Sequence, residues 1–172
     1  MDLFILELVQ NHFHNGFTDF IFPIITMLGN AGTVWLLTGV CLTITKKYRL
    51  YGIMIFITLA LTYTLGEFVL KPMIARPRPF LAFPGRALLI PPPNGYSFPS
   101  GHAGSSFSAA MILWRANKKI GTVGFGLAVL IAFSRVFLFV HYPSDVLAGA
   151  VLGVLCAFLT ISVCQRLQNA KN

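Results

Sequence analysis

Charged residues are scarce in this sequence of 172 residues, because only 10% of its positions are Asp, Glu, Lys or Arg. Hydrophobic residues make up 56% of the chain. Soluble globular domains carry about 25% charged residues, so the composition argues against that class. It indicates an integral membrane protein, and the length suits a single domain over residues 1–172.

Acidic residues and cysteines are especially few, with five and three of them respectively. So few carboxylates argue against a site for Mg²⁺ or Ca²⁺. Cys41, Cys156 and Cys164 all lie in apolar runs and show no CxxC or Cys/His ligand spacing. We therefore expect no disulfide, no metal and no cofactor. The net charge of +8 does not indicate a nucleic-acid partner in so apolar a chain. We expect its basic residues to set the orientation of the chain in the membrane and to bind an anionic substrate.

Lys and Arg are absent from the first twenty residues. A cleavable signal peptide begins with basic residues, so we expect none here. Glu7, Gln10, Asn11 and His14 instead recur at helical spacing among Leu, Ile, Phe and Val residues. This pattern predicts an N-terminal helix that lies in the membrane interface.

Long uncharged runs are the dominant feature of the remaining chain, and several approach the roughly 20 residues that a spanning helix needs. They cover residues 20–45, 50–66, 87–114, 120–134 and 146–165. The sequence GNAG, residues 29–32, predicts a kink in the first run. The expected fold is all-α: an integral membrane helical bundle of five spans, or six if residues 17–28 insert separately. Gly149 and Gly153 form a GxxxG pair, which we expect to pack against the chain's own bundle.

Basic residues predict the orientation of these spans, since cytoplasmic loops are enriched in Lys and Arg. Eight basic residues fall on one side of a five-span alternation: Lys46, Lys47, Arg49, Arg115, Lys118, Lys119, Arg166 and Lys171. We expect that side to be cytoplasmic in a multi-pass protein of the cell membrane. The other five fall on the outer side, where the rule does not predict them: Lys71, Arg76, Arg78, Arg86 and Arg135.

Three polar stretches meet on that outer side, at residues 71–79 (KPMIARPRP), 99–102 (PSGH) and 134–145 (SRVFLFVHYPSD). Ionisable groups are costly near the bilayer, so such a cluster indicates a functional site. Ser100 is placed to cap a helix, and Gly101 lets a ligand approach the backbone. Exposed N–H groups at a helix start bind anions. Lys71, Arg78 and Arg135 supply the positive charge that phosphate oxygens require.

Two histidines and one carboxylate in these stretches suggest a division of roles. His141 with Asp145 four residues later resembles a nucleophile or base with its orienting carboxylate. His102 then remains as the acid that protonates a leaving oxygen. The alternative is a pair of interfacial histidines that backbone groups satisfy.

The combined spacing Lys71-x6-Arg78-Pro79, Pro99-Ser100-Gly101-His102 and Ser134-Arg135-x5-His141-x3-Asp145 resembles the complete signature of the type 2 phosphatidic acid phosphatase family. That family shares its site with vanadium haloperoxidases.

The resemblance implies a metal-independent membrane phosphatase that acts through a phosphohistidine. Transferred position by position, it makes His141 the nucleophile, Asp145 its partner and His102 the general acid. Phosphoryl binding would fall to five residues: Lys71, Arg78, Ser100, Gly101 and Arg135.

Four features lie outside the signature. We expect Arg76 to contact lipid headgroups or the loop rather than phosphate, and Arg86 to be a headgroup anchor. Glu67, four residues before Lys71, is either a second residue of the site that holds this lysine or a plain interfacial ion pair. The Pro-rich residues 80–96 predict a cap or a substrate entrance rather than a span.

The small size and outward site suggest an enzyme similar to bacterial members that dephosphorylate undecaprenyl diphosphate. Phosphatidylglycerophosphate, phosphatidate and lipid A phosphate are competing substrates. Two other classes are a haloperoxidase, whose known relatives are soluble, and a non-catalytic lipid-binding or transport protein, which would need neither histidine.

Overall fold

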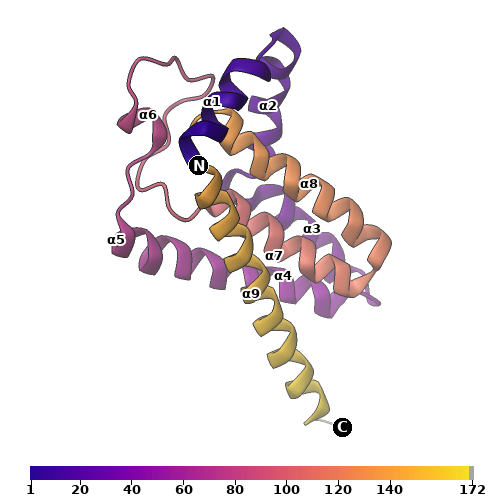
Figure 1. The fold of residues 1–172 in the computed structure, drawn as a ribbon. Coiled ribbons are helices and arrows are strands. Elements are labelled where there is room, and N and C mark those ends of the chain that lie inside the picture. Colours follow the sequence, from indigo (N-terminus) through magenta and orange to yellow (C-terminus); the bar gives the residue numbers. More distant parts are fainter. Residues whose placement is uncertain (171–172) are drawn as a thin grey trace.

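Every regular element in residues 1–170, the part of the chain that the computed structural model describes, is helical (Figure 1). In chain order they are α1 (Asp2–His12), α2 (Gly16–Leu28), the 3₁₀ turn η1 (Asn30–Gly32), α3 (Thr33–Ile44), α4 (Arg49–Tyr63), the π-helix η2 (Thr64–Leu70), α5 (Lys71–Ile74), α6 (Pro79–Ala82), α7 (Gly101–Ala116), α8 (Lys118–Phe137) and α9 (Pro143–Asn169). The predicted all-α bundle is confirmed. Lys171, one of the inner cations, lies outside the described residues.

α7 is the central helix, and α4, α8 and α9 all pack against it. A Cβ atom on Gly149 of α9 would collide with the carbonyl oxygen of Ser100, and one on Gly153 would collide with that of Gly104. The two helices therefore touch backbone to backbone, as small residues allow. This contact confirms that the GxxxG pair packs against the chain's own bundle.

The core of the bundle is apolar, with Trp35, Ile55 and Ile112 among its buried residues. The Trp35 Nε1–H donates to Ser106 Oγ at 3.0 Å, which satisfies the one polar atom of this large side chain. The outer surface is also apolar, and Val123 of α8 and Leu147 of α9 are exposed on it. Apolar residues on both the inside and the outside are typical of a helix bundle that lipid surrounds.

Three helical stretches are long and apolar enough to cross a membrane: Arg49–Ala82, Lys118–Phe137 and Pro143–Asn169. The pair α2 and α3 makes a fourth if it counts as one span, and it bends by 48° at η1. Gly32 there has a φ of 68°, so the predicted kink is confirmed. The predicted run 87–114 is helical only from Gly101, because the prolines before it prevent a helix, and α7 has 16 residues.

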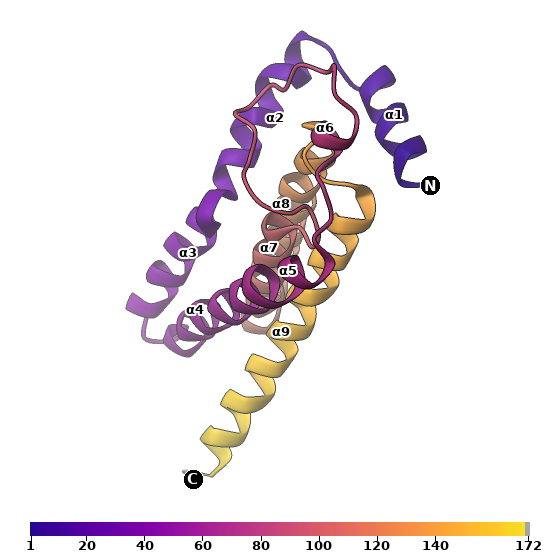
Figure 2. The ribbon, with the colours of Figure 1, turned by 90° about the vertical axis from the view of Figure 1, so that its left-hand side faces the viewer.

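α1 and the long loop after α6 lie together at one end of the bundle, and α9 ends at the other (Figure 2). Leu6 and Val9 of α1 are buried against residues 136–140, which connect α8 to α9. Gln10 Nε2 donates to the carbonyl oxygen of Phe137 at 2.8 Å. The N-terminal segment is helical as predicted, and the protein itself covers part of its apolar face.

Candidate active site

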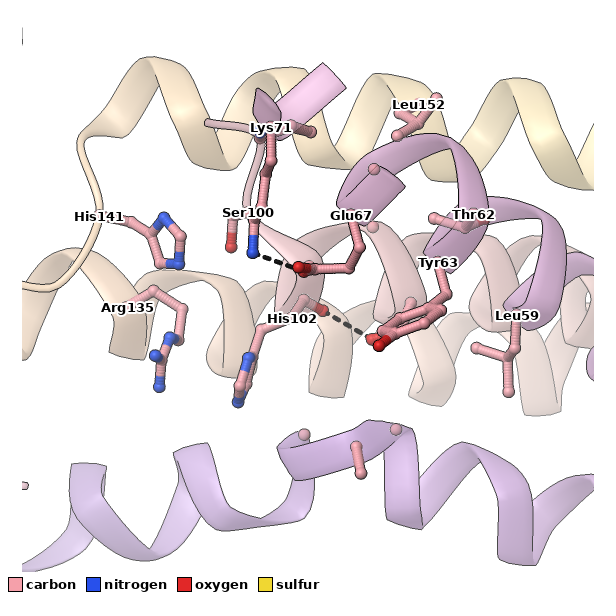
Figure 3. Close-up of a pocket in the computed structure, with 18 of the residues that line it drawn as sticks. Leu59, Thr62, Tyr63, Glu67, Lys71, Ser100, His102, Arg135, His141 and Leu152 are labelled. Carbon is pink, nitrogen blue, oxygen red and sulfur yellow. Dashed lines mark hydrogen bonds and ion pairs between the residues drawn. The ribbon is translucent and has the colours of Figure 1, made fainter. Parts of the chain in front are cut away.

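The three polar stretches meet where α5 ends, α7 and α9 begin and α8 ends. They border a cavity of about 620 Å³ (Figure 3). Eight of the nine residues singled out in the sequence line this cavity: Glu67, Lys71, Arg78, Ser100, Gly101, His102, Arg135 and His141. The ninth, Asp145, lies behind His141 and is fully buried.

His141 is presented by the short turn between α8 and α9. Phe139 has a left-handed φ of 58°, and the N–H groups of Val140 and His141 both donate to the carbonyl oxygen of Arg135 at 3.2 Å. The chain then enters α9 at Pro143, whose fixed φ suits the first turn of a helix. This turn directs the imidazole into the cavity, where only 2% of the residue is exposed.

The contacts of the imidazole assign its tautomer. Nε2 lies 3.1 Å from Arg78 Nη1, and since a guanidinium only donates, Nε2 must accept. The proton is then on Nδ1, 3.4 Å from Ser97 Oγ. Burial is the main factor that lowers the pKa of His141, to about 3; the nearby Asp145 carboxylate opposes this, and the charges of Arg135 and Arg78 add to it. With this lowered pKa the ring is neutral at pH 7, and the Nε2 electron pair points toward Arg78 on the cavity side.

Asp145 uses both carboxylate oxygens. Oδ2 accepts from Ser97 Oγ at 2.5 Å and from the Tyr142 N–H at 2.9 Å. The same oxygen lies 3.6 Å from His141 Nδ1, which is beyond hydrogen-bond length. Ser97 therefore bridges the predicted His141–Asp145 pair. Ser97 opens the polar stretch before α7, but its role was not apparent from the sequence because it lies 44 residues from His141.

Arg76 corrects the sequence interpretation. Its Nη1 donates to Asp145 Oδ1 at 2.6 Å. The main partner of Arg76 is therefore this carboxylate and not a lipid headgroup. The physical reason is that a carboxylate buried at a helix start requires a cation or several donors nearby. That requirement is the signal that the sequence offered, since Asp145 is an acid that the sequence itself places in the first turn of α9.

Arg78 and Arg135 are both only 3% exposed. Arg78 donates to the carbonyl oxygens of Gly95 and Asn94 in the loop and of Val140, each at 3.0 Å. The Pro-rich loop of residues 80–96 thus holds one of the site's cations. Arg135 Nη1 donates to Thr26 Oγ1 at 2.6 Å, but its Nε is buried and no group within residues 1–170 accepts from it. A buried N–H without an acceptor, in a positively charged cavity, favours an anionic ligand.

Glu67 and Lys71 form the predicted ion pair, with Oε1 and Nζ 2.5 Å apart (Figure 3). The π-helix η2 carries Glu67 and runs directly into α5, which begins at Lys71. A Cβ atom on Gly101 would lie 3.5 Å from Glu67 Oε1. The carboxylate therefore lies at the start of α7, beside the N–H groups that are expected to bind phosphate.

Ser100 and His102 occupy the first turn of α7. The Ser100 side chain caps the helix by accepting from the Ala103 N–H at 3.4 Å, and its own N–H donates to the Asp145 carbonyl oxygen at 3.0 Å. The His102 ring points toward the break between α2 and α3, with Nε2 3.0 Å from Asn30 Oδ1 (Figure 3). Asn30 lies in GNAG, which the sequence indicated only as a kink.

Metal ligands do not cluster in this site: within residues 1–170, no three His, Cys, Asp or Glu side chains are placed to hold a metal ion. The arrangement instead offers one nucleophilic nitrogen, a second imidazole and three cations. Together with the helical fold, it defines a class of membrane-embedded proteins in which a buried histidine faces a positively charged cavity.

This chain belongs to the PAP2 superfamily, which it matches over residues 47–169. It is 39% identical over 131 residues to an undecaprenyl-diphosphatase of Sulfolobus acidocaldarius, and the match covers 76% of this chain and 63% of that protein. The chain therefore spans slightly less than two thirds of that relative's length.

Two solved structures share the fold. The crystal structure of Aquifex aeolicus LpxE superposes with a TM-score of 0.83 at 28% identity, over 94% of each chain. A PAP2 type phosphatidylglycerolphosphate phosphatase from Bacillus subtilis gives a TM-score of 0.77 at 26% identity, over 96% of this chain and 85% of that one. Both likenesses extend over nearly the whole chain.

Proposed function

We propose that this protein hydrolyses a lipid phosphate or diphosphate through a phosphohistidine on His141, and that undecaprenyl diphosphate is its substrate. The observation that carries the proposal is the geometry of His141. Its unprotonated Nε2 faces a cavity in which Arg135 has a buried N–H without a partner. A neutral nucleophile and spare donors together suit attack on a phosphoryl group.

The reaction would proceed in two displacements at phosphorus. His141 Nε2 forms a bond to phosphorus while the bond to the lipid-side oxygen breaks, and His102 donates a proton to that oxygen. Water then attacks the phosphohistidine, the N–P bond breaks, and His102 accepts the proton of the water. Lys71, Arg78 and Arg135 stabilise the negative charge of both transition states.

The lining of the cavity supports a lipid substrate. Beyond the charged residues, the cavity continues along apolar side chains of α3, α4 and α9, including Leu36, Phe56, Leu59 and Leu152. An apolar chain attached to the phosphate could lie there without contact with water. The Sulfolobus relative favours a polyprenyl diphosphate, whereas the Bacillus structure keeps phosphatidylglycerophosphate as a second candidate. Phosphatidate and lipid A phosphate are the remaining alternatives.

The basic residues favour a site on the outer face of the cell membrane. α7 begins at the site and ends beside Arg115, while α8 begins with Lys118 and Lys119 and returns to the site. The positively charged turn therefore lies at the end of these helices opposite to the cavity. Since basic turns remain in the cytoplasm, the cavity would face outward.

A panel of substrates tests the proposal. Phosphate release by the purified protein is measured with undecaprenyl diphosphate, undecaprenyl phosphate, phosphatidylglycerophosphate, phosphatidate and lipid A. We expect the fastest turnover with undecaprenyl diphosphate, activity in excess EDTA, inhibition by vanadate and a phosphoryl label on His141. Preference for another lipid would replace undecaprenyl diphosphate as the proposed substrate. No phosphate release from any lipid, or a strict requirement for added Mg²⁺, would overturn the mechanism.

A further inference from the structure

Arg76 is not one of the signature positions, but it donates directly to the carboxylate behind His141. Its Nη1 donates to Asp145 Oδ1 at 2.6 Å and to Ser144 Oγ at 2.7 Å. Its guanidinium carbon lies 3.7 Å from the centre of the Tyr142 ring. Arg76 is not one of the described residues that border the cavity. It therefore contacts Asp145 on the side of His141 that faces away from the cavity.

Asp2 of α1 holds the other arm of this guanidinium. Arg76 Nη2 donates to Asp2 Oδ2 at 2.8 Å. Asp2 also accepts from the Ser144 N–H at 3.0 Å and from Ser144 Oγ at 2.5 Å. Partial burial acts to raise the pKa of Asp2, but hydrogen bonds from Arg76 and Ser144 outweigh it, so the pKa lies below its ordinary value.

These contacts give Asp2 the role of a helix cap supplied from elsewhere in the chain. α9 begins after Tyr142, whose side chain makes no capping hydrogen bond. The first N–H groups of a helix need acceptors, and a carboxylate also interacts favourably with the helix dipole. Asp2 satisfies the Ser144 N–H in this way and fixes Arg76 at the same time. α1 is thereby connected to the helix that carries Asp145.

We propose that Arg76 and Asp2 are positioning residues of the hydrolytic site, which hold the Asp145 carboxylate in place behind His141 and join α1 to the start of α9. The inference rests on the proposed phosphatase function. Its physical basis is a guanidinium whose two Nη atoms donate to two different carboxylates, Asp145 and Asp2, and so fix one relative to the other, which a single point charge does not do. Neither residue would contact the substrate.

The charges around His141 make this role measurable. The cavity that the ring faces is lined by the charged groups Arg78, Arg135, Lys71 and Glu67 and by His102. Asp145, Arg76, Asp2 and Tyr142 lie behind the ring. Without the Arg76 charge, Asp145 would favour the protonated form of His141 more strongly, so the acid limb of kcat/KM should move to higher pH. Without the Asp2 charge, the positive charge of Arg76 would no longer be partly balanced. It would then disfavour the protonated form of His141 more strongly, so the acid limb of kcat/KM should move to lower pH.

The experiment compares Arg76→Ala, Arg76→Lys and Asp2→Asn with the parent protein, using the lipid on which the parent is most active. Arg76→Ala should lower kcat by about 10- to 100-fold, as loss of a residue behind a site does, and leave KM within about two-fold. Arg76→Lys should recover part of kcat, because lysine keeps the charge but cannot bridge both carboxylates. Asp2→Asn should lower kcat several-fold.

Two matched controls lie nearby. Glu7 is exposed on α1, and Arg86 lies in the loop, where it contacts Gln10 at 3.4 Å. Glu7→Gln and Arg86→Ala should leave kcat and the pH profile unchanged. They remove the same charges from the same end of the bundle, so they separate a specific effect from a general change in surface charge.

Three outcomes would overturn the inference. Arg76→Ala with the parent's kcat would show no role for Arg76, and a raised KM with weaker vanadate inhibition would show that it binds phosphate directly. An equal loss at every pH, together with a lower Tm, would indicate structural support alone. If Arg76→Ala does not fold, Arg76→Lys and Asp2→Asn decide between these outcomes by the same measurements. Failure of the proposed phosphatase function would be recognised separately, because the parent protein itself would then show no phosphate release that depends on His141.

Discussion

The two sides of the His141 ring differ in how their polar groups are satisfied. On the cavity side, among the residues that the structure describes, Arg135 has a buried N–H without an acceptor and Lys71 has only Glu67 as its partner. Behind the ring, Asp145 has a hydrogen-bond donor on each oxygen. A buried polar group without a partner is costly, so the cavity side is arranged for a ligand. The side behind it is complete and serves to hold the ring.

Removal of the ring that separates the two sides should have the largest effect. We expect His141→Ala to lower lipid phosphate hydrolysis at least ~10⁴-fold, as loss of a covalent nucleophile does. Phosphate release and trapping of a phosphoryl label measure the change. His12→Ala, which alters an exposed histidine of α1, is the matched control and should be fully active. Substantial turnover by a folded His141→Ala protein would contradict the covalent mechanism.

A change on the cavity side should affect binding and chemistry together. We expect Arg135→Ala to reduce kcat/KM by about 10²- to 10³-fold, because a donor to the transition state is lost, and to weaken vanadate inhibition in parallel. Arg135→Lys should recover part of both. Thr26→Val removes only the partner of Nη1 and should cost less than Arg135→Ala. Unchanged vanadate inhibition in Arg135→Ala would show that Arg135 does not face the phosphoryl group.

A change behind the ring should affect turnover without affecting binding. Ser97→Ala removes the hydroxyl between His141 and Asp145, so the imidazole loses the group that fixes its tautomer. We expect kcat to fall by about 10-fold, in the range for such supporting residues, with vanadate inhibition unchanged. Steady-state kinetics with vanadate titration measures both. A parallel loss of vanadate affinity would remove the distinction between the two sides.

The smallest effect is expected at the edge of the cavity, where Glu67→Gln removes the counter-ion of Lys71 but keeps its size. The lysine would then bind phosphate or vanadate differently, with a several-fold change in kcat/KM that is smaller than the loss in Lys71→Ala. Kinetics of both single variants and the double variant give the coupling. Strictly additive effects would leave Glu67 as an interfacial acid that does not tune the site.

The sequence predicted the cavity side more completely than the side behind it. Lys71, Arg78, Ser100, Arg135 and His141 belong to local motifs whose residue types and spacing indicate anion chemistry, and the structure brings them together. Composition and apolar runs were enough to predict a helical membrane bundle. The uncharged run 87–114 alone overstated the length of the span, and the prolines within residues 80–96 were the sequence signal for the non-helical segment before Gly101.

The residues that sequence reasoning missed all act through long-range contacts. Asp2 is 142 residues from Ser144, and Arg76 is 69 residues from Asp145. No local periodicity connects such positions, and each has an ordinary explanation alone: an acid near a helix start, or an arginine near headgroups. Only the packing of α1 against the turn before α9 makes them neighbours. Asn30, which contacts His102 across 72 residues, was missed for the same reason.

At Gly149 and Gly153 the backbones of α7 and α9 are in direct contact, so no side-chain rotamer sets their separation at these two positions. The Ser100 N–H reaches the Asp145 carbonyl oxygen directly across this contact, at 3.0 Å. The distance from the phosphate-binding end of one helix to the histidine-bearing turn of the other is thus set by atomic radii, which lipid composition and temperature scarcely change. In the proposed enzyme, the phosphate group of every lipid substrate would therefore bind in the same geometry. Discrimination among tails must then arise where α3 and α4 border the cavity, around Leu36 and Phe56.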